Sequence, residues 1–258
     1  MKFIVAEIGH EIGTITFNNP EKRNALGSEM LNELTECLEY FKQKKARAVI
    51  IRAKKGVKVW SAGHDISELA KPGRDPLSYD DPLEITLRAI EQFPAPVIAL
   101  IEGSVWGGAC ELAFTCDIIV AGLDSTFAIT PAKIGVPYNS SGLLHFANAL
   151  GSKIVKEMFF TAKPISAQRA EFLGVVNHTI PEEDIEDFVY NMALTISENS
   201  PLAITAIKEQ LRMLSHAFPM NPVTFEKIQG LRRRVYDSED YKEGIEAFLE
   251  KRKPVFKG

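Results

Sequence analysis

Short apolar runs alternate with stretches of helical spacing along much of the chain. Residues 48–51, 97–101 and 117–121 are three such runs, each of a length suited to a buried parallel strand. Residues 28–42 and 82–92 instead have the spacing of helices. Strands that alternate with helices pair in parallel through crossover connections. The pattern therefore predicts an α/β fold.

The first residues predict a β-hairpin. Two runs of strand-forming residues, 3–8 and 14–17, lie on either side of Gly9, His10 and Gly13. Glycines between two such runs are typical of a tight turn, so we expect the two strands to pair in antiparallel.

The last part of the chain has a purely helical pattern, which begins at about residue 182. The sequence Asn-Ser-Pro at residues 199–201 is a natural boundary within it. We therefore expect residues 1–198 to form a core that carries the functional site. Residues 199–258 would form a helical region whose apolar faces fold back on the core or pack on another subunit, and we interpret it as an oligomerisation region.

Composition excludes several classes of protein. The 258 residues are 45% hydrophobic and 25% charged, with a net charge of −4. A nucleic-acid-binding protein usually shows a basic surface, so we expect no nucleic-acid partner. No run approaches the roughly 18–20 apolar residues that span a membrane, and the first residues have no apolar secretory segment. The expected location is the cytoplasm.

The cysteines and most of the histidines give no sign of a metal or redox site. Three cysteines, Cys37, Cys110 and Cys116, lie in apolar surroundings, and their odd number argues against a disulfide framework. Four histidines lack the spacing of metal ligands, so we interpret them as structural or surface residues. They are His10, His145, His178 and His216.

Two turns between strands and helices have the residues of an oxyanion site. One spans residues 60–66, and the other spans residues 102–111 and contains Gly107 and Gly108. Glycine leaves the backbone uncovered where a helix begins, so amide N–H groups without an intrahelical acceptor can point at a ligand. Two such donors would form an oxyanion hole, with each donor contributing about 2.7–4 kcal/mol. On spacing alone, the alternative that the glycines only permit close packing stays open.

Several segments, in a fixed order, resemble the enoyl-CoA hydratase/isomerase (crotonase) superfamily over nearly the whole chain. They are residues 23–26, 61–66, 103–113, 116–118, 127, 135–137 and 248–254. The resemblance implies a spiral of ββα turns followed by a helical trimerisation region, in a homotrimer or a dimer of trimers. It also implies an acyl-CoA thioester as the substrate, with no metal and no cofactor other than the coenzyme A of the substrate.

The resemblance also implies roles for individual residues. By position, the thioester carbonyl would lie between the backbone N–H groups of His64 and Gly108; the alternative for His64 is acid–base chemistry by its ring. Thr130 would contact the substrate, and Lys251 would reach the phosphates of coenzyme A. The adenine and pantetheine would contact one segment, formed by Ala62, Gly63, His64, Asp65 and Ile66.

One substitution decides which reaction we expect. Hydratases of this superfamily use two glutamates as acid and base. Glu111 occupies the first of these positions, but the second falls on Pro131, which cannot transfer a proton. Decarboxylation of a malonyl-type thioester needs an enolate but no strong base, because loss of CO2 delivers the electrons. We therefore expect biotin-independent decarboxylation of methylmalonyl-CoA, or of malonyl-CoA, to propionyl-CoA or acetyl-CoA.

Three longer segments, residues 73–82, 104–108 and 235–241, resemble decarboxylating members of the superfamily. This resemblance implies that Tyr138 hydrogen-bonds the carboxylate and turns the breaking C–C bond perpendicular to the thioester plane. The alternative is that Tyr138 only caps its turn, and Glu111 stays open between a proton donor and a structural partner. Two rival functions are an enoyl-CoA hydratase or isomerase that uses Glu111, and a non-catalytic acyl-CoA- or RNA-binding homologue.

Overall fold

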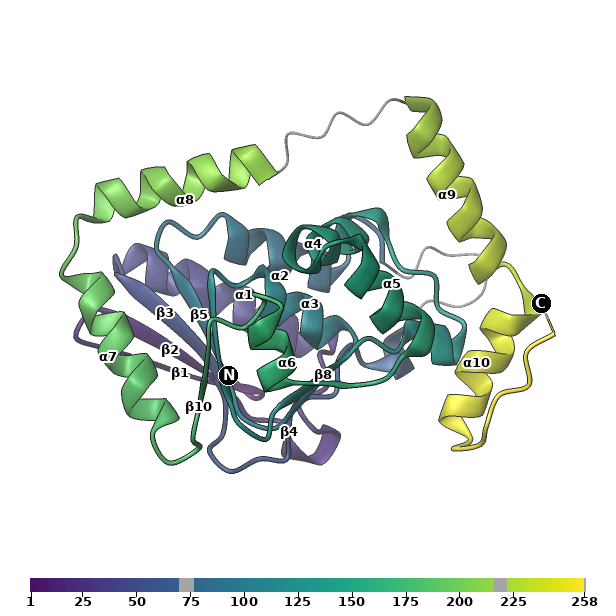
Figure 1. Ribbon diagram of the computed structural model, residues 1–258, viewed down its shortest axis with the longest axis horizontal. Coiled ribbons are helices and arrows are strands. Elements are labelled where there is room, and N and C mark those ends of the chain that lie inside the picture. The colour runs from purple at the N-terminus through teal and green to yellow at the C-terminus, as the bar shows by residue number, and fades with distance from the viewer. Residues whose placement is uncertain (70–76, 216–221, 258) are drawn as a thin grey trace.

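Two β-sheets form the centre of the molecule in a computed structural model that describes residues 1–69, 77–215 and 222–257 (Figure 1). The six-stranded sheet has the order β1-β2-β3-β5-β7-β10, and the four-stranded sheet has the order β4-β6-β8-β9. The strands are β1 Ile4–Gly9, β2 Ile12–Phe17, β3 Ala48–Ala53, β4 Val59–Ser61, β5 Val97–Ile101, β6 Ser104–Trp106, β7 Ile118–Gly122, β8 Thr126–Ala128, β9 Ile165–Ser166 and β10 His178–Ile180.

Consecutive strands of the central repeats lie in different sheets. β3, β5 and β7 pair in parallel in the larger sheet, while the strands that follow them, β4, β6 and β8, pair in parallel in the smaller one. A helix follows each second strand. This arrangement is a spiral of ββα turns, which confirms the predicted fold class. The sequence analysis missed β4, β6 and β8, because strands of three residues are too short to show a period.

Helices cover both faces of the larger sheet. The α-helices are α1 Ser28–Gln43, α2 Pro82–Glu91, α3 Gly108–Thr115, α4 Ser140–Leu150, α5 Ser152–Thr161, α6 Ala167–Phe172, α7 Ile185–Ser197, α8 Pro201–Ser215, α9 Pro222–Tyr236 and α10 Glu239–Leu249. Along β3, Val49 and Ile51 join the core cluster under α1, and Ile50 joins the opposite cluster under α7. Because both faces are covered, β3 and β5 are buried throughout, which explains their continuous apolar runs.

The N-terminal hairpin is confirmed, and its turn lies within the expected residues but is shorter. β1 and β2 pair in antiparallel, and Gly9 faces Ile12 across the turn. The two turn residues are His10 and Glu11, whose φ angles of 50° and 60° are those of a type I′ turn. Gly13 lies inside β2.

The three cysteines are buried, and none is in a disulfide. Burial raises the pKa of the Cys37 thiol to about 12, so this thiol stays protonated. Their burial agrees with the prediction that the three cysteines are thiols of the core.

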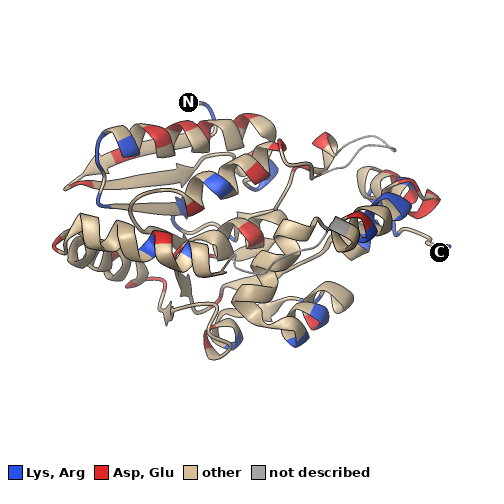
Figure 2. Ribbon diagram, turned by 90° about the horizontal axis from the view of Figure 1, so that it is seen from above, with Lys and Arg blue, Asp and Glu red and all other residues tan. Residues whose placement is uncertain are grey.

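The last helices lie outside the layers that surround the sheets (Figures 1 and 2). α10 packs on the 3-10 turn η3 (Pro131–Ile134), where a Cβ on Gly244 would lie 2.1 Å from the carbonyl oxygen of Ile134. α8 has no buried residue, and Leu202 is 82% exposed. Basic and acidic residues are interspersed along the helices (Figure 2). Of the described helices, none combines the length and apolar character needed to cross a membrane.

Gly13→Ala is expected to destabilise the protein by about 1–3 kcal/mol, because a Cβ there would lie 2.5 Å from the buried ring of Phe41. The matched control is Gly9→Ala in the same hairpin, where nothing lies within 4 Å of the added Cβ. Chemical denaturation of both variants measures the difference. Equal free energies of unfolding for the two variants would contradict the packing of β2 on α1.

Candidate active site

Two chain segments approach each other at the carboxyl ends of β4 and β6. A Cβ on Gly63 would lie 2.3 Å from the carbonyl oxygen of Trp106 and 3.2 Å from the amide nitrogen of Gly108. Gly63 also has a φ of 84°, a conformation that other residues rarely adopt. Ser61 holds this loop, since its Oγ donates to the carbonyl of Asn24 at 2.6 Å and accepts from the N–H of Gly63 at 3.2 Å. The close approach therefore requires glycine at position 63.

The approach brings together two amide groups that have no acceptor. Leu26 donates to the carbonyl of Gly63 at 2.8 Å and accepts from the N–H of Asp65 at 3.1 Å, and this bridge leaves the N–H of His64 unused. Gly108 is the first residue of α3, where the helical ladder offers its N–H no acceptor. A Cβ on Gly108 would lie 3.5 Å from the amide nitrogen of His64. Within the described chain, the two N–H groups are therefore neighbouring donors with nothing to bind.

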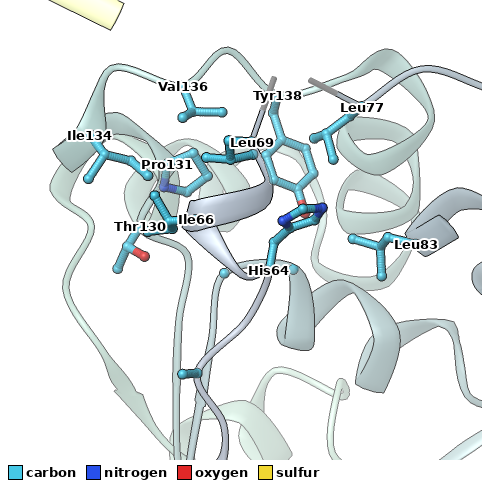
Figure 3. A pocket seen from close by; sticks show the side chains of 13 residues that line it. His64, Ile66, Leu69, Leu77, Leu83, Thr130, Pro131, Ile134, Val136 and Tyr138 are labelled. Carbon is cyan, nitrogen blue, oxygen red and sulfur yellow. The ribbon is translucent and has the colours of Figure 1, made fainter. Parts of the chain in front are cut away.

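These amides border a cavity with mostly apolar walls (Figure 3). It is lined by Ala62, His64, Ile66, Leu69, Leu77, Leu83, Gly107, Gly108, Thr130, Pro131, Ile134, Val136 and Tyr138. Pro131, the residue that we expect in place of a hydratase's second glutamate, is one of them. Among these described lining residues, none carries a carboxylate.

Tyr138 enters the cavity from η3 and α4, and its hydroxyl has a buried partner (Figure 3). The hydroxyl donates to Oε2 of Glu111 at 2.5 Å, and Glu111 is fully buried. The ring packs against Phe146 and Phe159. Burial raises the pKa of the Tyr138 phenol well above its ordinary value, and the Glu111 carboxylate raises it further. The phenol therefore stays protonated, and its one proton points at Glu111.

Behind Tyr138, Glu111 contacts a histidine on the next helix. Nδ1 of His145 lies 3.1 Å from Oε1 of Glu111, and Nε2 lies 3.5 Å from Oε1 of Glu91. A second carboxylate, Glu84, accepts hydrogen bonds from the amide of Asn139 and, at 3.0 Å, from Ser141. Burial raises the pKa of the Glu84 carboxyl, and the charge of Glu111 adds to this effect.

Both ring nitrogens of His64 face an oxygen atom of the protein, so the ring is not a free base. Its Nδ1 lies 3.2 Å from the carbonyl oxygen of Asp65, and its Nε2 lies 3.9 Å from a carboxylate oxygen of Asp81. Burial lowers the pKa of the His64 imidazole, but the carboxylate of Asp81 more than offsets this, so the net pKa is raised. Asp81 is itself fixed as the N-cap of α2, where it accepts from the N–H of Leu83 at 2.8 Å.

The structure brings together most of the residues expected at the site. The cavity lining includes six of them: Ala62, His64, Ile66, Gly108, Thr130 and Tyr138. Gly63 is buried behind the amides, and Asp65 turns its carboxylate to Lys22 at 2.7 Å. Lys251 follows α10, is exposed and does not line the cavity.

The polar groups behind the cavity lie outside the predicted site. The sequence predicts His145 as a structural or surface histidine and gives no sign of Glu84. The available signal was Asn139 as a helix N-cap directly after Tyr138, which places His145 on the same helix. His216 and residues 73–76 lie outside the described residues. Among the described residues, no cluster of three His, Cys, Asp or Glu side chains could hold a metal ion.

Comparisons with known proteins identify relatives along the whole chain. The enoyl-CoA hydratase/isomerase family model matches residues 7–258. Methylmalonyl-CoA decarboxylase of Escherichia coli (strain K12) is 52% identical over 249 residues, which cover 96% of this chain and 95% of that protein. A crystal structure of methylmalonyl-CoA decarboxylase complexed with 2S-carboxypropyl-CoA has a TM-score of 0.98 at 50% identity, covering 100% of this chain and 99% of that one. The 2,3-dehydroadipyl-CoA hydratase of the same E. coli strain is 29% identical over 95% of this chain and 94% of that protein.

Gly63→Ala is expected to weaken the binding of an acyl-CoA thioester and to destabilise the protein by about 1–3 kcal/mol beyond its control, because the new methyl group would force the two amide-bearing loops apart. The control is Gly56→Ala, which has a similar φ of 77° but nothing within 4 Å of the added Cβ. Calorimetric titration and thermal unfolding of both variants test this. If the two variants behave alike, the loops are not held by this contact.

Proposed function

The chain belongs to the enoyl-CoA hydratase/isomerase family, and from this premise we propose that it decarboxylates methylmalonyl-CoA to propionyl-CoA and CO2. One observation carries the proposal: two amide donors without acceptors border an apolar cavity in which position 131 is a proline. The similarity to methylmalonyl-CoA decarboxylase of E. coli supports it. So does the carboxypropyl-CoA bound by a related crystal structure, which supports an acyl-CoA substrate.

The amides of His64 and Gly108 would hold the thioester oxygen of the substrate. As the bond between C2 and the carboxyl carbon breaks, its electron pair moves toward the thioester carbonyl, and the oxygen gains the charge of an enolate. Fixed N–H donors in an apolar cavity stabilise that charge more than they stabilise the neutral carbonyl. The thioester itself accepts the electrons, so the reaction needs neither biotin nor a metal.

The apolar walls would favour loss of the carboxylate. A localised carboxylate loses more hydration in such a cavity than the dispersed charge of the transition state does. Pro131 adds no carboxylate that would repel the substrate, and a base is not needed to form the enolate. Thr130 lines the cavity close to Gly107, where it would contact the bound acyl group.

Tyr138 would orient the carboxylate of the substrate. Tyr138 lines the cavity, and its ring is held by Phe146 and Phe159. If its hydroxyl proton turned from Glu111 to the substrate, a donor held in this way would keep the breaking bond perpendicular to the thioester plane. For the rest of the substrate, we propose contacts of coenzyme A with residues 62–66 and of its phosphates with Lys251.

Residues 199–258 would serve subunit association, as a homotrimer or a dimer of trimers. The accessible surface of the chain is 13514 Å². A folded monomer of this mass is expected to expose only about 11,300 Å². Large apolar side chains on the last helices are exposed, among them Leu202, Leu214, Val223 and Leu231. Burying them against other subunits would account for the excess surface. We place the assembly in the cytoplasm, where buried thiols stay reduced.

The purified protein is expected to release CO2 from methylmalonyl-CoA and to leave crotonyl-CoA largely unhydrated, since Pro131 leaves hydration without its second carboxylate. Release of CO2 can be coupled to a spectrophotometric assay, and loss of the crotonyl double bond can be followed by its absorbance. Rapid hydration with no CO2 release would favour the hydratase. Tight binding of coenzyme A without any turnover would favour a binding protein.

Tyr138→Phe is expected to lower kcat for CO2 release about a hundredfold, because the carboxylate loses its orientation, while the KM for methylmalonyl-CoA changes little. Its matched control is Tyr190→Phe, which removes a hydroxyl bonded to Thr14 at 2.9 Å and should keep wild-type kinetics. Steady-state kinetics of both variants, measured well below their unfolding temperatures, give the comparison. An unchanged kcat for Tyr138→Phe would make this residue structural only.

A further inference from the structure

A chain of titratable groups runs from the cavity to the surface of the protein. It begins at the Tyr138 hydroxyl, continues 2.5 Å to Glu111 and 3.1 Å from Glu111 to Nδ1 of His145, and ends 3.5 Å from Nε2 at Glu91. The exposed fraction of the side chain rises along it, from 0% at Glu111 to 15% at His145 and 18% at Glu91. Both outer residues line a groove on the surface, formed by α2, α4 and α9. The two inner contacts have hydrogen-bond distances, and the outer ion pair brings the chain to the surface.

Decarboxylation requires a supply of protons to the substrate. The substrate loses CO2 from C2 and must gain one proton there, so each turnover consumes a proton from solvent. The cavity that holds C2 is apolar, and none of its lining residues carries a carboxylic acid. Tyr138 is the lining residue that has both a hydroxyl proton and a buried connection to a titratable chain.

The Tyr138 hydroxyl cannot donate to Glu111 and to the substrate at once, and protonation of Glu111 through the same titratable groups would free it for the substrate. A phenol has one proton, and here that proton is donated to Glu111, so it is not available to the cavity. If Glu111 carries a proton on Oε2, the direction of this hydrogen bond reverses. Glu111 then donates to the phenol oxygen, and Tyr138 donates into the cavity.

We propose that Glu91, His145 and Glu111 form the path by which solvent supplies a proton to Tyr138, and that Tyr138 transfers it to C2 in place of CO2. The inference rests on the proposed decarboxylation. His145 does not touch the substrate in this account. It acts as a positioning residue, through Glu111 and Tyr138.

Each step conserves protons. The imidazolium of His145 gives the Nδ1 proton to Oε1 of Glu111, and rotation of the carboxyl group then brings this proton to the side of Tyr138, whose hydroxyl turns toward the cavity. After the C–C bond breaks, the enolate takes the hydroxyl proton at C2, while the proton on Glu111 moves to the phenol oxygen. Glu111 is again a carboxylate, and neutral His145, which keeps the proton on Nε2, takes a new proton from solvent at Nδ1 when its ring turns toward the groove beside Glu91.

The surroundings of His145 favour the charged imidazole. Burial lowers the pKa of His145, but the carboxylates of Glu111, Glu91 and Glu84 more than offset this and raise it. The other titratable groups near the path are Cys110 beside Tyr138, Arg212 near Glu91, and Arg88 and Arg232 on the same groove. Because the imidazolium is the form that supplies the proton, kcat should fall as the pH rises through the raised pKa of His145.

The test is His145→Gln in the full-length protein, assayed as CO2 release from methylmalonyl-CoA across the pH range. Glutamine still donates a hydrogen bond to Glu111 but carries no titratable proton. We expect kcat to drop about a hundredfold, within the usual range for general acid catalysis, and its alkaline decline to disappear, while KM changes less than about twofold. The control His178→Gln changes a histidine on β10 that packs on Phe188, and should keep the wild-type profile.

Glu91→Gln provides a second test, which holds whether or not the His145→Gln variant folds. Removing this carboxylate takes away a charge that favours the imidazolium, so the pKa of His145 falls and the alkaline decline of kcat moves to lower pH. Wild-type pH profiles in both variants would overturn the proton path and leave decarboxylation intact. Failure of the wild-type protein to release CO2 would instead overturn the proposed function.

Discussion

The contact between Gly63 and the carbonyl of Trp106 fixes the geometry on which the active site depends. β4 and β6 are parallel neighbours, so their carboxyl ends lie side by side, and the turns that follow them meet. A side chain at position 63 would stand 2.3 Å from a backbone oxygen, which no rearrangement of a side chain can relieve. Glycine there lets the amides of His64 and Gly108 approach until one bound oxygen can accept from both.

The fold provides this pair of donors, but the choice of reaction depends on what surrounds it. Relatives of the same fold include a hydratase as well as a decarboxylase. In this chain, Pro131 removes one carboxylate from the cavity, and Tyr138 separates the other, Glu111, from it. A cavity that could hold an enolate with no carboxylate among its described lining residues suits the loss of CO2 that we propose.

Burying Glu84 and Glu111 near one another costs free energy unless each finds partners. The partners come from α4 and the two residues before it: Tyr138 and His145 bind Glu111, while Asn139 and Ser141 bind Glu84. Gly142 is part of the same packing, because a Cβ there would lie 2.3 Å from the Tyr138 ring. A buried network at this cost is easier to understand as functional than as a means of stabilising the fold.

The sequence predicted those parts of the structure whose signals are local. The apolar runs of β3 and β5 reflect burial on both faces, and the amides of His64 and Gly108 follow from glycines at helix starts and from family motifs. The strands β4, β6 and β8 could not be predicted, because three residues are too short to show a period. The pairing of Glu111 with His145 was missed because 34 residues separate them. The hydrogen bond from Tyr138 to Glu111 is likewise visible only in the structure.

The carbonyl stretching frequency of bound propionyl-CoA, labelled with carbon-13 at the thioester carbonyl, tests the paired amides most directly. Difference infrared spectra of the labelled and unlabelled ligand isolate this one bond. Two fixed N–H donors in an apolar cavity should polarise the carbonyl more than water does, and lower its frequency below the value in water. A frequency at or above the value in water would mean that the carbonyl lies in the cavity without these donors, and would contradict the oxyanion hole.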